Sequence, residues 1–262
     1  MRSTALPPIF DRRSFANARV CGSGNGNDFS VYSSAKHRTP PANSTQMPPF
    51  SADSASSQMP PSPFRPSDAG RYRLSFTAGA LLPSEMAELA RAYERLGNWD
   101  GVAKAIRAEG LLGYPSAKTA ERIGAELIGR LRELDAPLVD RLRICIPEER
   151  RMVAWVACCR HYSFVREFAT EVVRERFLAG GGSVSRADYL SFFERKEAQH
   201  PELASVSEST RDKLRQVLFR MFVDAGILAK GGAIQPVSIP EPLLSLLDRA
   251  DALCFPVFVR EG

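Results

Sequence analysis

Apolar residues recur at three- and four-residue spacing from about Arg71 to Ala225, and Gly or Pro repeatedly interrupts the pattern. This spacing places Leu, Ile, Val and Phe on one face of successive short helices. Such helices have to bury their apolar faces against one another, so we predict a mainly α fold, a helical bundle. The predicted helices begin near Pro83, Asn98, Ser116, Pro137, Pro147, Phe164, Ser183 or Ser185, and Ser207 or Ser209.

Strand signals appear only after the last long helix. They comprise Ile227-Leu228, residues 234–239 and a short stretch at 255–259, with a turn at Lys230-Gly231-Gly232. The helices at 185–196 and 209–225, followed by a Gly-turned hairpin, have the order of a winged helix. We therefore expect a C-terminal winged-helix-like element that carries a small β-hairpin.

Residues 1–70 have a different composition from the rest. Ser, Pro, Asn and Gly dominate, Leu6 is the single leucine, and no helical or strand period lasts a full turn. Such a segment buries too little apolar area to offset the entropy of ordering it, so we expect a disordered tail. The alternative is that translation starts later, at Met47 or Met59. The expected organisation is this tail at 1–70, an N-terminal helical domain at 71–146, a helical bridge at 147–182 and a C-terminal domain at 183–262.

Charge and cysteine content exclude several classes of protein. The formal net charge of +5 is shared unevenly along the chain. Residues 1–70 hold seven of the 35 basic and four of the 30 acidic residues, so 28 basic and 26 acidic residues remain in residues 71–262. No apolar run approaches the roughly 18 residues of a spanning helix, and no secretory signal opens the chain. Five cysteines do not suggest a disulfide framework. We expect a cytoplasmic protein without a membrane partner.

Enzyme signatures are missing from the sequence. The glycines of residues 22–26 lie in the tail. A dinucleotide site requires a strand before such glycines and a helix after them, and the sequence predicts neither there. Cys158, Cys159 and His161 resemble a metal cluster, but adjacent helical side chains point about 100° apart. We therefore expect buried core cysteines, no metal, no cofactor and no catalytic activity.

The segment from Trp99 to Leu134 has the proportions of a helix-turn-helix. A short helix and a Gly/Pro-containing turn precede a longer helix with a polar and basic start. The candidate DNA-binding residues there are Ser116, Lys118, Thr119 and Arg122. Lys118 and Arg122 are four residues apart and so share one face, as a recognition helix requires. An ordinary helical hairpin with a basic outer face fits the same pattern, and both interpretations stay open.

A second basic cluster lies at the start of the last long helix. Hydroxyls, backbone N–H groups and cations at a helix start favour phosphate binding. The candidate residues are Ser209, Thr210, Arg211, Lys213 and Arg215, with Lys230 in the predicted wing. The connection at 199–206 is longer than a tight turn requires. A small α+β domain that uses its charges for solubility is the alternative.

Several short motifs occur in a fixed order along the chain. They are Phe76-Thr77-Ala78-Gly79-Ala80-Leu81-Leu82, Asn98-Trp99, Ala117-Lys118-Thr119-Ala120-Glu121-Arg122, Arg130-Leu131 with Leu134, Arg166-Glu167-Phe168-Ala169, and residues 209–217 running into Ala225-Gly226-Ile227-Leu228. In this order they resemble the BrxA family, small proteins encoded in BREX bacteriophage-exclusion systems. The resemblance covers about Leu74 to Leu247.

The resemblance implies an all-helical, non-enzymatic protein with two helix-turn-helix elements that binds double-stranded DNA in a phage-defence system. It selects Lys118, Thr119 and Arg122 in the first element, and Ser209, Thr210, Arg211, Lys213 and Arg215 in the second. The tail departs from the family pattern. We therefore expect a DNA-binding accessory protein that has other BREX components as possible partners. Two alternatives stay open: a protein–protein adaptor that organises the defence complex, and an RNA-binding protein of the antitermination type.

Overall fold

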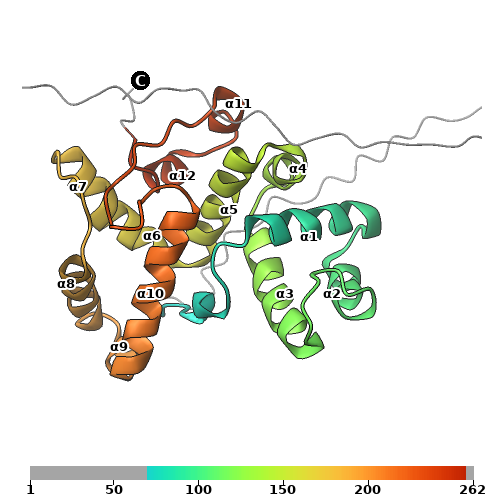
Figure 1. Cartoon of the computed structure of the whole chain (residues 1–262), viewed down its shortest axis with the longest axis horizontal. Coiled ribbons are helices and arrows are strands. Elements are labelled where there is room, and N and C mark those ends of the chain that lie inside the picture. Colours follow the sequence, from blue (N-terminus) through green and yellow to red (C-terminus); the bar gives the residue numbers. More distant parts are fainter. Residues whose placement is uncertain (1–69, 258–262) are drawn as a thin grey trace, which may run out of the picture. The chain divides into compact units, whose positions relative to one another are not determined.

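Helices joined by short turns make up most of residues 70–257, the part of the chain that the computed structural model describes (Figure 1). These residues belong to one compact unit, residues 56–262. The predicted tail, apart from Gly70, lies outside the described residues, as do residues 258–262. The helices are α1 (Pro83–Leu96), α2 (Trp99–Ala108), α3 (Ala117–Leu131), α4 (Ala136–Ile144), α5 (Pro147–His161), α6 (Ser163–Phe168), α7 (Glu175–Leu178), α8 (Arg186–Glu197), α9 (Pro201–Ala204), α10 (Glu208–Asp224), α11 (Glu241–Leu244) and α12 (Arg249–Leu253). A 3-10 turn, η1 (Ser75–Ala78), precedes α1, and a π-helical segment, η2 (Ala169–Arg174), joins α6 to α7.

Capping residues fix the predicted helix ends. The side chain of Asn98 accepts a hydrogen bond from the Gly101 N–H at 2.6 Å at the start of α2. Ser116 and Ser207 cap α3 and α10 in the same way. At the other end, Gly97 and Gly226 adopt left-handed conformations after α1 and α10. These predicted starts and stops are confirmed. The long connection at 199–206 holds the short helix α9.

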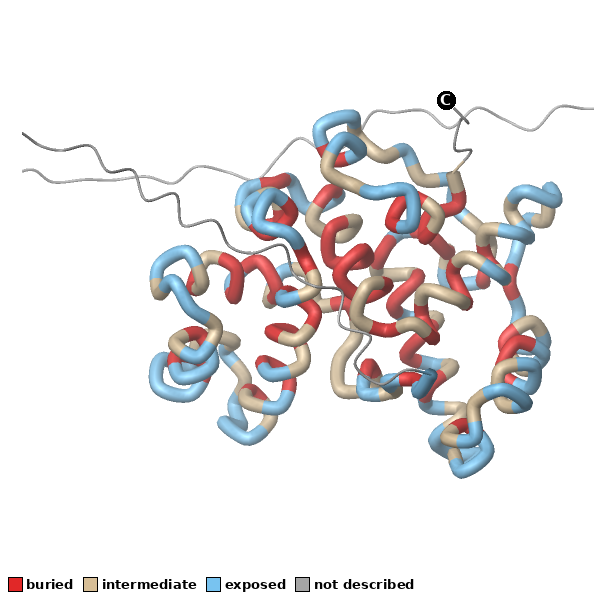
Figure 2. Tube along the Cα trace, turned by 180° about the vertical axis from the view of Figure 1, so that it is seen from behind, coloured by how far each residue is buried: buried red, intermediate tan, exposed pale blue. Residues whose placement is uncertain are grey.

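Helix α5 lies at the centre of the apolar core. Its residues from Val153 to Cys159 are at most 1% exposed, and the helix packs against α1, α3, α4, α6 and α12. The indole N–H of Trp155 donates to the Cys254 carbonyl at 3.0 Å, and the Phe222 ring centroid lies 4.5 Å from that of Trp155. Figure 2 shows the buried stretches where the helices face one another and the exposed ones on the outer turns. The core is therefore continuous through both halves of the described chain.

The prediction of β-strands is wrong for residues 70–257, where only two isolated antiparallel bridges form, Leu228 with Ile234 and Ser183 with Ala233. Two backbone hydrogen bonds, between residues 229 and 233 and between 235 and 227, close the turn at Lys230. Pro236 and Pro240 follow at once and lack the N–H groups that a longer ladder needs. The short strand predicted at 255–259 is not found either, since residues 255–257 form no β-strand. Residues 258 and 259 lie outside the described chain.

A buried arginine fixes the entry into α1. Arg130 on α3 is fully buried, and its guanidinium donates to the carbonyls of Ala80 at 3.0 Å and Leu81 at 3.3 Å. Its Nε donates to the Tyr162 hydroxyl at 3.1 Å. These bonds satisfy the charged group inside the core and hold the segment before Pro83 in place. They bring the segment before α1 into contact with Arg130, two stretches about fifty residues apart in sequence.

Candidate nucleic-acid interface

Helices α2 and α3 pack closely through a glycine. A Cβ atom at Gly124 would lie 2.4 Å from the Ile106 Cδ1 atom, so the two helices approach more closely there than a side chain allows. The stripe at Ala120, Ile123 and Leu127 is buried against this contact. The start of α3 is thereby turned outward, as the sequence predicted.

The cations at the start of α3 face solvent. Lys118 and Arg122 are exposed, and neither makes an ion pair with any carboxylate in residues 70–257. Thr119 is half-buried, and its N–H donates to the Ser116 hydroxyl oxygen at 3.4 Å. This turn of helix therefore presents two uncompensated positive charges beside the exposed Ser116.

The start of α10 carries hydroxyl groups and one free cation. Ser209, Thr210 and Lys213 are exposed. The Thr210 hydroxyl lies 2.9 Å from that of Ser207, the helix cap. No carboxylate of the described chain pairs with Lys213. This start therefore resembles that of α3 in chemistry, with a single unpaired ammonium.

The two arginines predicted at the same site are already engaged within the fold. Arg211 lies 3.2 Å from the Glu197 carboxylate, and its guanidinium stacks 4.3 Å from the Phe193 ring centroid. The Arg215 Nε lies 3.4 Å from Asp212. Both arginine side chains are only about a quarter exposed, 26% and 22% respectively. They shape the start of α10 and add little free charge to it.

Lys230 is not part of this cluster. It is exposed in the turn that follows α10, beyond the C-terminal end of the helix. The neighbouring Gly232 carbonyl accepts a hydrogen bond from the Val184 N–H at 2.8 Å, which holds the turn on the segment before α8. Nine of the ten predicted residues therefore gather at two helix starts, and Lys230 stands apart.

The two helix starts lie on the same side of the described chain. In Figure 1, α3 and α10 both begin at the lower edge of the view and run upward. The segment that leads into α1 contacts both halves of the fold: the Tyr72 N–H donates to Glu202 of α9 at 2.6 Å, and the Ser75 hydroxyl of η1 donates to Glu126 in the middle of α3 at 2.8 Å. The N-terminal ends of these helices, about ninety residues apart in sequence, therefore lie at the same edge of the fold but at separate places along it.

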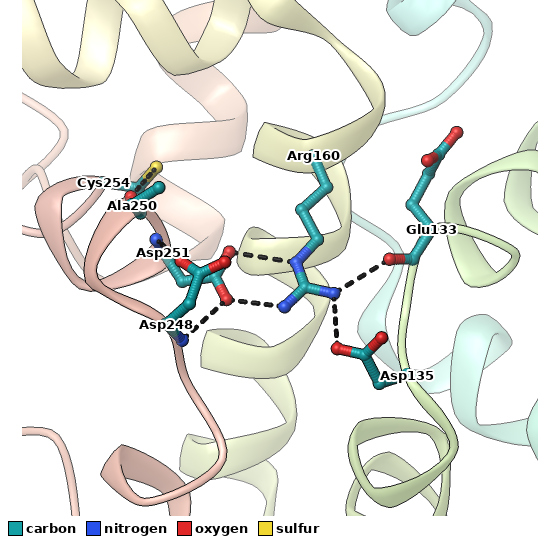
Figure 3. Close-up of polar contacts among 7 residues, drawn as sticks. All are labelled: Glu133, Asp135, Arg160, Asp248, Ala250, Asp251 and Cys254. Carbon is teal, nitrogen blue, oxygen red and sulfur yellow. Dashed lines mark hydrogen bonds and ion pairs between the residues drawn. The ribbon is translucent and has the colours of Figure 1, made fainter. Parts of the chain in front are cut away.

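A network of hydrogen bonds and ion pairs surrounds Arg160, and no pattern in the sequence predicts it (Figure 3). Its guanidinium donates to both carboxylate oxygens of Asp251 in α12, at 3.0 and 2.7 Å, and to Asp135 at 2.9 Å. The hydrogen bonds that Arg160 donates to the Asp251 carboxylate raise the pKa of Arg160 above its usual value. A cavity of about 270 Å³ adjoins these residues. Asp251 is 91 residues away in sequence, so no local signal pointed to the pair.

Groups of metal-ligating side chains and membrane-spanning helices are two further features to compare with residues 70–257. No group of His, Cys, Asp and Glu side chains in residues 70–257 is arranged to hold a metal ion. The thiols of Cys158 and Cys159 are buried in α5, and burial raises the pKa of each. None of the helices of this region is long and apolar enough to cross a bilayer.

Comparison with known proteins decides the family. The sequence profile of the BrxA family matches residues 70–251, most of the chain. The chain belongs to the BrxA family. The matched range contains all of the ordered motifs, from Phe76 to Leu228.

Two relatives carry the name BREX protein BrxA. One, from Bacillus cereus (strain H3081.97), is 29% identical over 178 residues, 67% of this chain and 86% of the relative. The other, from Paramagnetospirillum magneticum (strain ATCC 700264 / AMB-1), is 23% identical over 179 residues, 68% of this chain and 90% of the relative. A crystal structure of an uncharacterized protein from Magnetospirillum magneticum has a similar fold, with a TM-score of 0.63 at 20% identity, covering 70% of this chain and 97% of that one.

Proposed function

We propose that this BrxA-family chain is a component of a BREX phage-defence system and binds double-stranded DNA without catalysing a reaction. The observation that carries the proposal is the presence of exposed, unpaired cations at the starts of α3 and α10, two helix starts at one edge of the fold. Lys118, Arg122 and Lys213 are exposed and unpaired within residues 70–257, and all three lie at these starts. Cations beside hydroxyls and helix N-termini bind phosphate oxygens, which supply most sequence-independent affinity for DNA.

The order of elements around α10 supports a winged-helix interpretation of the C-terminal half. The extended residues 182–184 precede α8, α10 follows, and the turn at Lys230 folds back after it. The Ile234 N–H donates to the Gly182 carbonyl at 2.8 Å, so the turn pairs with the segment before α8. A winged helix has this succession, with α10 as recognition helix and Lys230 at the tip of a minimal wing.

The test replaces the three unpaired cations together, as Lys118→Ala, Arg122→Ala and Lys213→Ala. The affinity for DNA falls as the salt concentration rises, and each lost phosphate contact should make the slope of log affinity against log salt less steep by about 0.9. The slope of the triple variant should therefore be less steep than that of wild type by about 3. Gel-shift titrations at several salt concentrations, on duplexes of unrelated sequence, measure the slope. The triple variant should lose the same factor in affinity for every duplex, whatever its sequence.

Arg220→Ala is the matched control, because Arg220 lies near the opposite end of α10 and its side chain is 73% exposed. We expect it to bind as wild type. If the triple variant binds duplexes unchanged at every salt concentration, the assignment of these helix starts is wrong. Stronger binding to an RNA competitor would favour the antitermination-type alternative, and no binding to any nucleic acid would favour the adaptor.

A further inference from the structure

Two isoleucines are exposed at the turn between α4 and α5. Ile144 is 66% exposed and Ile146 is 61% exposed, more than any other large apolar side chain among the residues whose burial is described. The chain between them is not loose, because the Arg150 guanidinium donates to the Cys145 carbonyl at 3.0 Å. Exposed apolar area that is rimmed by polar residues marks interaction surfaces, so the surroundings of this turn decide its interpretation.

A basic cavity of about 540 Å³ adjoins this turn. Pro147, directly after Ile146, lines it together with Arg150 and Arg151 of α5, and Arg220 enters from the end of α10. Arg151 and Arg220 form only surface pairs, at 3.1 Å with Glu148 and 3.8 Å with Asp224, and such pairs contribute little. Both guanidinium groups can therefore exchange their present partners for an incoming carboxylate.

The lining has an excess of positive charge. Arg150, Arg151 and Arg220 stand against the carboxylates of Glu85 and Asp224. An arginine can bind a carboxylate through two parallel hydrogen bonds. The site therefore combines apolar area at the turn with cations in the adjoining cavity.

We infer that this surface, formed by Ile144, Ile146 and the arginine-lined cavity, docks an acidic segment of a partner protein, with apolar side chains covering the isoleucines and carboxylates entering the cavity. The chemistry of the two parts selects the occupant. A segment with only apolar residues would form no ion pair with the guanidinium groups, and one with only acidic residues would leave the isoleucines in water.

Other occupants fit less well. The chain's own residues 1–69 carry seven basic and four acidic residues, so their net charge has the wrong sign. In a two-fold symmetric dimer formed through this surface, the arginines of one copy would face the same arginines of the other copy and repel them. Duplex DNA would leave Ile144 and Ile146 uncovered. The α10 residues that line the cavity lie seven to eleven residues beyond Lys213, roughly 10 to 17 Å along the helix at a rise of 1.5 Å per residue. A partner and DNA could then bind at the same time.

The experiment uses an array of overlapping synthetic peptides that covers the other proteins of the BREX system, probed with the full chain. Selected peptides are then titrated by fluorescence anisotropy. Wild type should bind peptides that combine Asp or Glu with Leu, Ile or Phe. The double variants Ile144→Ser/Ile146→Ser and Arg151→Glu/Arg220→Glu should each bind them at least tenfold more weakly, whereas Leu178→Ser, which changes an exposed leucine (39%) elsewhere, should bind as wild type.

Thermal unfolding and the DNA gel shift accompany each variant. Both double variants should unfold near the wild-type temperature, since Ile144, Ile146 and Arg220 are exposed and Arg151 is only partly buried, and should bind duplex DNA as before. Failure of wild type to bind any peptide, or equal binding by wild type and both double variants, overturns the inference. So does a loss of DNA binding by Arg151→Glu/Arg220→Glu, which would assign the cavity to nucleic acid. None of these peptide-binding results affects the test of the α3 and α10 starts, which the gel shift of the Lys118, Arg122 and Lys213 triple variant decides by itself.

Discussion

Lys213 and Arg211 lie two residues apart near the start of α10, yet their surroundings differ completely. Arg211 packs on Phe193 and pairs with Glu197, whereas Lys213 is exposed and unpaired in the described chain. The arginine joins α10 to α8, and its removal would disturb packing as well as charge. Lys213 is therefore the residue of the two whose replacement reports on a bound phosphate.

Glycine at position 232 is required by its neighbours. A Cβ atom there would lie 2.3 Å from the Val184 carbonyl oxygen, and the residue has φ +84°. We expect Gly232→Ala to lower the free energy of unfolding by about 3 kcal/mol, because the clash is with backbone and the conformation is strained for alanine. Urea denaturation measures the loss.

The adjacent Gly231→Ala is the control, since a Cβ atom there meets nothing within 4 Å. It should change stability by less than about 1 kcal/mol. Equal stability of the two variants would contradict a close contact between the Lys230 turn and the segment before α8.

At the scale of the element, helix starts are fixed by local chemistry. Ser185 and Asp188 form a capping box at the start of α8, in which each side chain bonds the backbone N–H of the other residue. Ser116 and Ser207 cap α3 and α10, the two helices whose starts carry the candidate site. Because a cap lies within three residues of the groups it satisfies, such starts can be predicted from sequence, and here they were.

The capping box makes α8 sensitive to acid. Burial opposes ionisation of Asp188, but hydrogen bonds from Ser185 and the charge of Arg176 outweigh it and lower the pKa of the carboxyl. Its stabilisation is therefore present above the unfolded pKa, near 3.9, and is lost as pH falls through the folded value. Asp188→Asn should be less stable than wild type by about 1 kcal/mol at pH 7, with a smaller difference near pH 3.

Denaturation curves at the two pH values measure this difference. Asp100→Asn is the control, because Asp100 lies in the first turn of α2 but its side chain is 90% exposed. It should leave stability unchanged at pH 7. A constant difference between Asp188→Asn and wild type at both pH values would show that the carboxylate charge does not stabilise α8.

At the scale of the whole described chain, a few long-range polar contacts join distant segments to α5. Arg160 connects this helix to α12 through Asp251 and to the α3–α4 connection through Asp135 and the Glu133 carbonyl (Figure 3). Asp251 is only 3% exposed. The C-terminal segment is therefore held by an ion pair as well as by Phe255 and Cys254 in the core.

Removing the arginine should release this segment. Arg160→Met leaves the Asp251 carboxylate buried without its cation, and we expect a loss of about 3 kcal/mol in stability. Hydrogen exchange should accelerate in α12 and stay unchanged in α2. Adding Asp251→Asn to Arg160→Met should restore part of the stability, because no buried charge is left unpaired. If α12 exchanges at the wild-type rate in Arg160→Met, the ion pair does not hold the segment.

Much of the fold was predictable from sequence because helix signals are local. Apolar spacing and the caps at Asn98, Ser116 and Gly226 predicted where α2, α3 and α10 begin or end. The strand prediction failed because a ladder depends on partner N–H groups, which Pro236 and Pro240 interrupt. The Arg215 pair with Asp212 spans three residues and could also have been predicted.

By itself, the sequence determined the succession of amphipathic helices and the basic residues at the starts of α3 and α10. Only the tertiary structure decided which of these cations stay free. Glu197 reaches Arg211 from another helix, 14 residues away, whereas Lys118, Arg122 and Lys213 meet no carboxylate of the described chain. The position of both helix starts at one edge of the fold, and the Arg160–Asp251 pair, likewise depend on packing between remote segments. A residue's neighbours in sequence fix its helix, but side chains brought together by the core fix its charge environment.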